Sequence, residues 1–126
     1  MYKILLAEDD AAMRQYLVRA LERSGYAVTA VGDGHAAHEL LCAGLHFDRL
    51  LTDIVMPGMD GIELAQKATL KSPDIKVMFI TGFSAVSLRA GKTMPQAKVL
   101  SKPFHLRDLV LEVERAFGIG SYSNQL

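Results

Sequence analysis

The sequence lacks the features that identify several broad classes of protein. Its 126 residues contain one cysteine, Cys42, and no tryptophan. A single cysteine cannot form an internal disulfide, which excludes a small disulfide-stabilised scaffold. Lys plus Arg and Asp plus Glu number 14 each, and no long basic stretch breaks this balance. The even charge argues against direct binding to nucleic acid.

Long apolar runs are also missing. The apolar segments are short, and the first of them begins at Lys3 without the pattern of a signal peptide before it. We therefore expect no membrane contact and a cytoplasmic location. The length fits one domain with a real hydrophobic core. Any output of this chain would then come through binding to other molecules.

Apolar runs do alternate regularly with segments of helical periodicity. The runs predict strands at Lys3–Ala7, Ala27–Val31, Arg49–Thr52, Val77–Ile80 and Lys98–Ser101. The segments between and after them predict helices from the Asp10 cap to Gly25, over His35–Ala43, over Gly61–Lys71, over the short stretch Phe83–Arg89, and along Leu106, Leu109, Val110, Val113 and Phe117. Strands that alternate with helices indicate an α/β fold with a parallel sheet.

Polar side chains follow four of the predicted strands. Glu8 and Asp9 follow the first, Asp53 ends the third, Thr81 follows the fourth and Lys102 follows the fifth. The carboxyl ends of parallel strands meet at one edge of a sheet, where ligands bind, so we expect one pocket there. Crowded carboxylates repel one another, and a hard divalent cation with oxygen ligands relieves the repulsion. The expected cation is Mg²⁺.

Other polar residues have simpler interpretations. Asp10 and Asp60 are placed to cap helices rather than to bind a ligand. His35 and His38 lie one helical turn apart, but no further Cys or His neighbours them in sequence, so a solvated helix face is expected. Cys42 is expected to be a small buried residue near a helix end. A strand-end Asp such as Asp53 usually caps the next turn, and only the other strand-end residues favour a site.

These residues carry a resemblance to a known family over roughly residues 2 to 117. The order and spacing of Glu8-Asp9, of Asp53 with Met56-Pro57-Gly58-Met59-Asp60-Gly61 after it, of Thr81-Gly82 and of Lys102-Pro103-Phe104 resemble the receiver domain of two-component response regulators. The resemblance implies a flavodoxin-like, doubly wound sheet with strand order 2-1-3-4-5 and five helices. It also implies a receiver domain over residues 1–118 and a flexible tail over residues 119–126.

The same resemblance implies roles for the pocket residues. Asp53 would accept a phosphoryl group from a histidine kinase or histidine phosphotransferase. Thr81 and Lys102 would contact the phosphoryl oxygens. Asp9, Asp53 and the backbone carbonyl of Val55 would hold Mg²⁺, with Glu8 acting through water. The chain would then be a regulator and no enzyme, with at most a slow loss of its own phosphoryl group.

Two departures from the commonest receiver pattern are apolar. Val55 and Phe83 stand where many receivers carry polar side chains that orient an attacking water, which predicts a long-lived aspartyl phosphate. Val99 stands where many receivers carry an aromatic residue that changes rotamer on activation. Signalling would then use the segment from Thr81 to Leu88 instead.

Within the family, four stretches look like single-domain alphaproteobacterial cell-cycle regulators: Ile4–Asp10, Leu51–Pro57, Phe79–Phe83 and Val99–Pro103. That likeness implies a phosphorelay member that binds the ClpXP protease when unphosphorylated and controls regulated proteolysis. Two alternatives stay open. One is a stand-alone receiver that serves as a relay intermediate or as the partner of a kinase, a motor or the transcription machinery. The other is a small hydrolase with Asp53 as nucleophile. Such enzymes usually need a second acid two residues further on, where this chain has Val55.

Overall fold

The computed structural model describes residues 2–81, 92–94, 97–101 and 106–117. Strands and helices alternate along residues 3–81 as the sequence predicts. The strands are β1 (Lys3–Ala7), β2 (Ala27–Val31), β3 (Arg49–Asp53), β4 (Lys76–Thr81) and β5 (Lys98–Ser101). The helices are α1 (Ala11–Arg23), α2 (Gly34–Cys42), α3 (Gly61–Lys71) and α5 (Leu106–Phe117). The expected helix over Phe83–Arg89, the side chain of Lys102 and the expected tail lie outside the described residues.

The strands form a parallel sheet in the order β2-β1-β3-β4-β5. The chain first moves from β1 to β2 on one side, and then continues with β3 on the other side of β1. This reversal is the topological switch point of a doubly wound sheet, where a crevice opens at the carboxyl ends of the strands. The predicted flavodoxin-like order is confirmed across β2, β1, β3 and β4.

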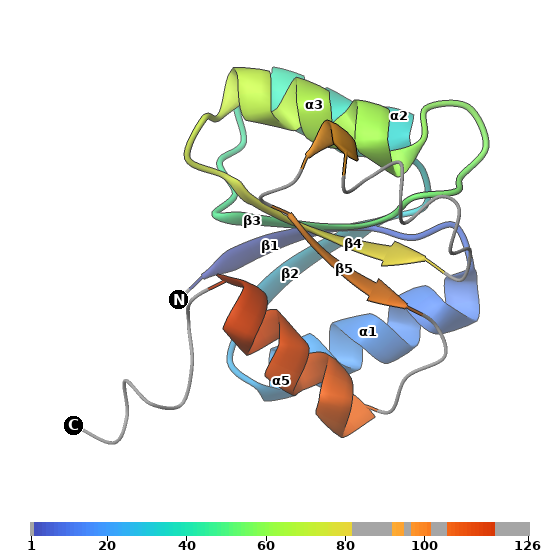
Figure 1. Cartoon of the computed structure of the whole chain (residues 1–126), viewed down its shortest axis with the longest axis vertical. Coiled ribbons are helices and arrows are strands. Elements are labelled where there is room, and N and C mark those ends of the chain that lie inside the picture. Colours follow the sequence, from blue (N-terminus) through green and yellow to red (C-terminus); the bar gives the residue numbers. More distant parts are fainter. Residues whose placement is uncertain (1, 82–91, 95–96, 102–105, 118–126) are drawn as a thin grey trace.

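Helices cover both faces of the sheet. Figure 1 shows α2 and α3 over one face and α1 and α5 over the other. Leu5, Leu50 and Phe79 are buried with the residues of α2 and α3, whereas Ile4 and Leu51 are buried with those of α1 and α5. Because both faces are covered, β1 and β4 are apolar at consecutive positions, Ile4–Ala7 and Val77–Ile80, instead of at alternate positions.

Aspartates begin three of the helices. The Asp10 carboxylate accepts the Met13 N–H at 3.0 Å, and the Asp60 carboxylate accepts the Glu63 N–H at 2.8 Å. Both capping predictions are confirmed. Asp33, which the sequence places in a turn, accepts the Ala36 N–H at 2.7 Å, so α2 begins at Gly34 and not at His35.

The expected burial of Cys42 is wrong. The inward face of α2 consists of Gly34, Ala37 and Leu41. Cys42 follows Leu41 and points about 100° away from it around the helix axis. Its thiol is exposed.

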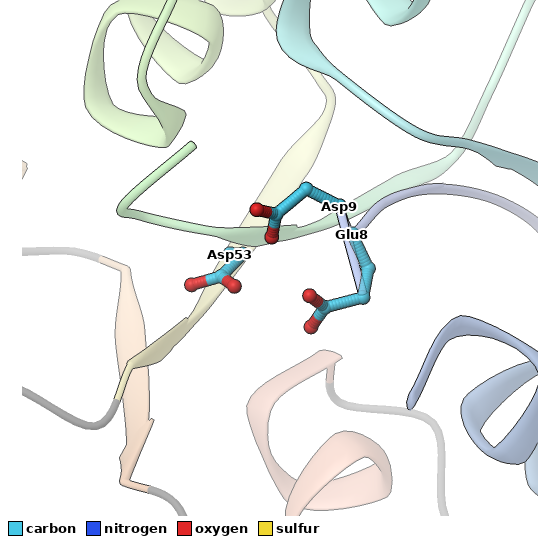
Figure 2. Close-up of side chains that lie close together, drawn as sticks. All are labelled: Glu8, Asp9 and Asp53. Carbon is cyan, nitrogen blue, oxygen red and sulfur yellow. The ribbon is translucent and has the colours of Figure 1, made fainter. Parts of the chain in front are cut away.

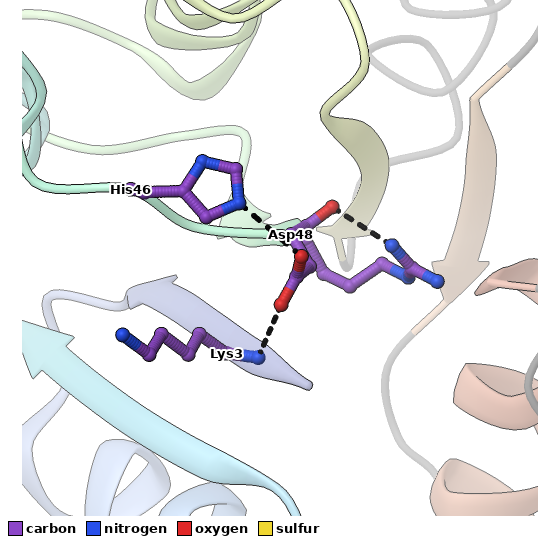
Figure 3. A network of polar contacts seen from close by, with 4 residues as sticks. Lys3, His46 and Asp48 are labelled. Carbon is purple, nitrogen blue, oxygen red and sulfur yellow. Dashed lines mark hydrogen bonds and ion pairs between the residues drawn. The ribbon is translucent and has the colours of Figure 1, made fainter. Parts of the chain in front are cut away.

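A polar network links the amino ends of β1 and β3, at the edge of the sheet opposite the carboxyl ends of the strands. The Lys3 N–H donates to the Asp48 carboxylate at 2.8 Å, and His46 Nε2 lies 3.3 Å from the same group (Figure 3). The Arg49 guanidinium donates to the Asp48 carbonyl at 3.0 Å and stacks 4.5 Å from the ring centroid of Tyr2. The Lys3 N–H, with help from His46, holds the pKa of Asp48 below its ordinary value.

Candidate functional site

Three carboxylates meet where β1 and β3 end. One oxygen from each of Glu8, Asp9 and Asp53 lies within 4.8 Å of the others. Figure 2 shows Glu8 and Asp9 approaching from the segment after β1 and Asp53 approaching from β3. Glu8 is fully buried and Asp53 is 6% exposed, whereas Asp9 is exposed. Of these three side chains only Asp9 is exposed, so the group is accessible to solvent from the side of Asp9.

The strand register explains why these residues meet. Ala7, the last residue of β1, pairs with Thr52 of β3. The next residues along the two chains are Glu8 and Asp53, so their backbones leave the sheet side by side. The sequence prediction that strand ends bring the three acids together is confirmed for these residues.

Hydrogen bonds fix Glu8 at both its backbone and its side chain. Its N–H donates to the Val31 carbonyl at 3.1 Å, and its carboxylate accepts the Asp10 N–H at 3.1 Å. Arg14 donates from its guanidinium to the Glu8 carbonyl at 2.8 Å. Arg14 was not among the predicted site residues, because one basic residue in the first turns of a helix does not indicate where its long side chain reaches.

A close approach of two backbones fixes the end of β3. The Gly61 N–H donates to the Ile54 carbonyl at 2.8 Å. A Cβ atom on Gly61 would collide with the carbonyl oxygen of Asp53 and would lie 2.9 Å from the Cα of Ile54. Only glycine lets α3 begin this close to Asp53.

The other predicted site residues are placed to different degrees. Asp53 pairs with Ile80, so Thr81 stands one position beyond it at the end of the neighbouring strand, and Thr81 is buried. Val55 is 46% exposed, two residues after Asp53. Lys102 follows Ser101, which pairs with Thr81, and lies outside the described residues.

The donor set suits a hard divalent cation. Glu8, Asp9 and Asp53 offer only carboxylate oxygens, the ligands that Mg²⁺ and Ca²⁺ prefer. Two of the three carboxylates are buried, so solvent screens their mutual repulsion poorly. A cation at this position would remove that repulsion. The residues present therefore fit the expected magnesium ion.

A family model for the response regulator receiver domain matches residues 4–114. The chain belongs to this family. Receiver domains are regulatory modules, and their fold is the one described above. The match spans all three acidic residues, Thr81 and Lys102.

One curated relative is similar over almost its whole length. The response regulator receiver protein CpdR of Brucella abortus is 60% identical over 116 residues, which cover 91% of this chain and 96% of that protein. Most of CpdR therefore corresponds to the single domain seen here.

Solved receiver structures share the fold. A receiver protein from Sinorhizobium medicae superposes with a TM-score of 0.84 at 30% identity, covering 93% of this chain and 94% of that one. The response regulator TrrA of Thermotoga maritima, in complex with Mg²⁺ and BeF, gives 0.79 at 26% identity, covering 92% and 99%. This homologous complex is consistent with Mg²⁺ binding by the acidic residues. Within the described residues, no helix is both long enough and apolar enough to span a bilayer.

Proposed function

We propose that this chain is a single-domain response regulator whose Asp53 accepts a phosphoryl group from a histidine donor. One observation carries the proposal: the nearly buried carboxylate of Asp53 ends a central strand beside two further carboxylates, in a member of the receiver family. The receiver would span residues 1–118, with residues 119–126 as its tail.

The proposed reaction is a displacement at phosphorus. A carboxylate oxygen of Asp53 attacks, the P–N bond to the donor imidazole breaks, and the new bond is an acyl phosphate P–O bond. The electron pair of the broken bond stays on the imidazole nitrogen. Because a donor histidine must reach Asp53, the donor approaches from the side where Asp9 is exposed.

Several other residues of the chain would contribute to this reaction. Glu8 is held by Asp10 and Arg14, so it stabilises the loop that carries Asp9. Thr81 would hydrogen-bond one phosphoryl oxygen and Lys102 would pair with another. Asp9, Asp53 and the Val55 carbonyl would hold Mg²⁺, with Glu8 acting through water. When bound, Mg²⁺ would offset the negative charge that gathers between the carboxylates and the phosphoryl group.

Phosphoramidate tests this chemistry because its P–N bond resembles that of phosphohistidine. The chain is incubated with phosphoramidate and Mg²⁺, digested at low pH, and mapped by mass spectrometry. We expect one phosphorylated peptide, with the group on Asp53. Phosphorylation that persists at another residue while Asp53 stays unmodified would overturn the assignment.

We also propose that the output of the switch is regulated proteolysis in the cell cycle. The support is the 60% identity to CpdR over nearly its whole length. The unphosphorylated chain would bind the ClpXP protease in the cytoplasm, and phosphorylation would end that binding. The alternative output is a relay step, or binding to a kinase, a motor or the transcription machinery.

Binding to purified ClpX separates these outputs. The parent chain is compared with and without phosphoramidate, and Asp53→Ala serves as the control that cannot be switched. Control of ClpXP is supported if the unphosphorylated parent binds ClpX and phosphoramidate ends that binding. Asp53→Ala should then bind ClpX with or without phosphoramidate. An absence of binding in every state favours the alternative partners.

A further inference from the structure

The segment that joins β3 to α3 packs on a helix that supplies no residue to the phosphorylation site. This β3–α3 segment, residues 54–60, contains Val55, whose carbonyl would be a magnesium ligand. The side chains of Met56 and Met59 are buried in the same core cluster as Ala37 of α2. Helix α2 therefore supports the β3–α3 segment from below the surface.

The first two residues of α2 also contact the β3–α3 segment directly. A Cβ atom on Gly34 would lie 2.6 Å from the carbonyl oxygen of Met59, so the two backbones approach closely. A Cβ atom on Gly58 would lie 3.2 Å from both Cδ2 and Nε2 of His35, so the imidazole lies against Gly58. His35 is exposed, in line with its expected place on a solvated helix face, but this edge of its ring packs on the segment.

The Val55 carbonyl lies between two anchors of the β3–α3 segment. On one side, the Gly61 N–H donates to the Ile54 carbonyl at 2.8 Å. On the other side, Gly58 is covered by the imidazole of His35. The side chain of Val55 is 46% exposed and adds little packing of its own. The position of its carbonyl therefore depends on both anchors.

The rigidity of an oxygen ligand affects Mg²⁺ and Ca²⁺ differently. Mg²⁺ requires short ligand distances and a nearly ideal octahedron, whereas Ca²⁺ accepts longer distances and a flexible geometry. A ligand that is held in place therefore favours Mg²⁺. A ligand that shifts should cost Mg²⁺ more affinity than Ca²⁺.

We infer that His35 is a positioning residue that gives the acidic site part of its preference for Mg²⁺ over Ca²⁺. The imidazole acts through Gly58 and the β3–α3 segment, and not as a ligand. The inference rests on the proposed function, in which the Val55 carbonyl holds the ion together with Asp9 and Asp53.

The full chain with His35→Ala tests this role against the parent. Each protein is titrated with Mg²⁺ and, separately, with Ca²⁺, and the NMR signals of the Asp9 and Asp53 amides report binding. We expect Mg²⁺ binding to weaken by at least about tenfold, as when other partners that orient a metal ligand are removed. Ca²⁺ binding should weaken by a clearly smaller factor, and its persistence shows that the site is still folded.

A change in charge cannot produce the same result. A positive charge on His35 would repel the bound cation, so removal of that charge alone would tighten the binding of both ions. The predicted effect of lost positioning has the opposite sign. Weaker Mg²⁺ binding in His35→Ala therefore separates the two explanations.

Two further variants serve as controls. His35→Phe keeps a flat ring against Gly58 and should retain the parent's ratio of Mg²⁺ to Ca²⁺ affinity. His38→Ala removes an imidazole one turn further along α2, where the ring lies beside Cys42, and should change neither affinity. A ratio in His35→Phe as low as in His35→Ala would contradict a role that depends on packing.

The outcomes also separate this inference from the proposed function. Parent-like binding of both ions by His35→Ala, or an equal loss for both, would refute the role of His35 and leave phosphorylation at Asp53 untouched. A parent chain that binds no Mg²⁺ would overturn the inference together with the proposed function.

Discussion

A glycine, as well as the acids around it, helps to fix the position of Asp53. Gly61 begins α3 directly against the carbonyl of Asp53, where no Cβ fits. On the other side, Arg14 and Asp10 hold Glu8. The starts of α3 and α1 therefore fix the backbone of Asp53, and the backbone and carboxylate of Glu8. A change at any of these supporting residues should reach the site without removing a carboxylate.

Gly61→Ala should displace the end of β3. We expect a loss of about 1 to 3 kcal/mol in the free energy of unfolding, because the added methyl group has no space. Mg²⁺ binding should weaken as well. Urea unfolding and Mg²⁺ titration measure the two effects. Gln66→Ala is the control, since Gln66 is exposed on the same helix. Equal losses in both variants would contradict this role for Gly61.

The apolar residues Val55 and Phe83 predict a slow loss of the phosphoryl group. Val55 is exposed beside Asp53, and an apolar side chain there cannot orient an attacking water. The double substitution Val55→Asn with Phe83→Glu should shorten the lifetime of the aspartyl phosphate. Release of phosphate after removal of the donor measures this lifetime. A double variant that dephosphorylates no faster than the parent would sink the explanation.

At the scale of elements, the starts of α1, α2 and α3 are set by aspartate caps. Asp33→Ala removes the acceptor for the Ala36 N–H and should cost about 1 kcal/mol of stability. Phosphorylation at Asp53 should be unaffected. Chemical unfolding gives the first quantity and intact mass the second. Glu39→Ala, at an exposed position inside the same helix, should change stability by less than about 0.5 kcal/mol. A loss as large for Glu39→Ala would show that the cap is not the cause.

The elements themselves were predictable from local pattern. The bounds of β1, β2, β5 and α3 follow from apolar runs and from glycine and proline signals, and the structure has them where predicted. The start of α2 was misplaced because Asp33-Gly34 fits a turn and a capped helix equally well. The burial of Cys42 was wrong because the phase of a short helix decides which side of it faces the core.

The acidic part of the site was predictable because its residues end parallel strands. The contacts that hold these acidic residues in place were not predictable. The contact of Arg14 with the Glu8 carbonyl depends on the rotamer of a long side chain. Elsewhere in the molecule, the contact of Lys3 with Asp48 depends on strand pairing across 45 positions. The spacing of residues in the sequence does not predict these contacts.

At the scale of the whole molecule, the network at the far edge of the sheet predicts how stability depends on pH. The folded pKa of Asp48 lies below its unfolded value, so its charged form stabilises the fold. That contribution is complete above the unfolded pKa of about 3.9 and is lost as the pH falls through the lower folded pKa. Unfolding free energies of the parent and of Asp48→Asn should therefore differ by a constant amount above pH 5 and converge in acid. A difference that grows on acidification would contradict the sign.

The most direct test of the whole account is the intact mass of the chain after incubation with a small phosphodonor and Mg²⁺, beside Asp53→Ala. We expect the mass of one added phosphoryl group on the parent, no addition to Asp53→Ala, and none to the parent when Mg²⁺ is chelated. A parent chain that binds Mg²⁺ and still gains no phosphoryl group would contradict it, as would an adduct that survives in Asp53→Ala.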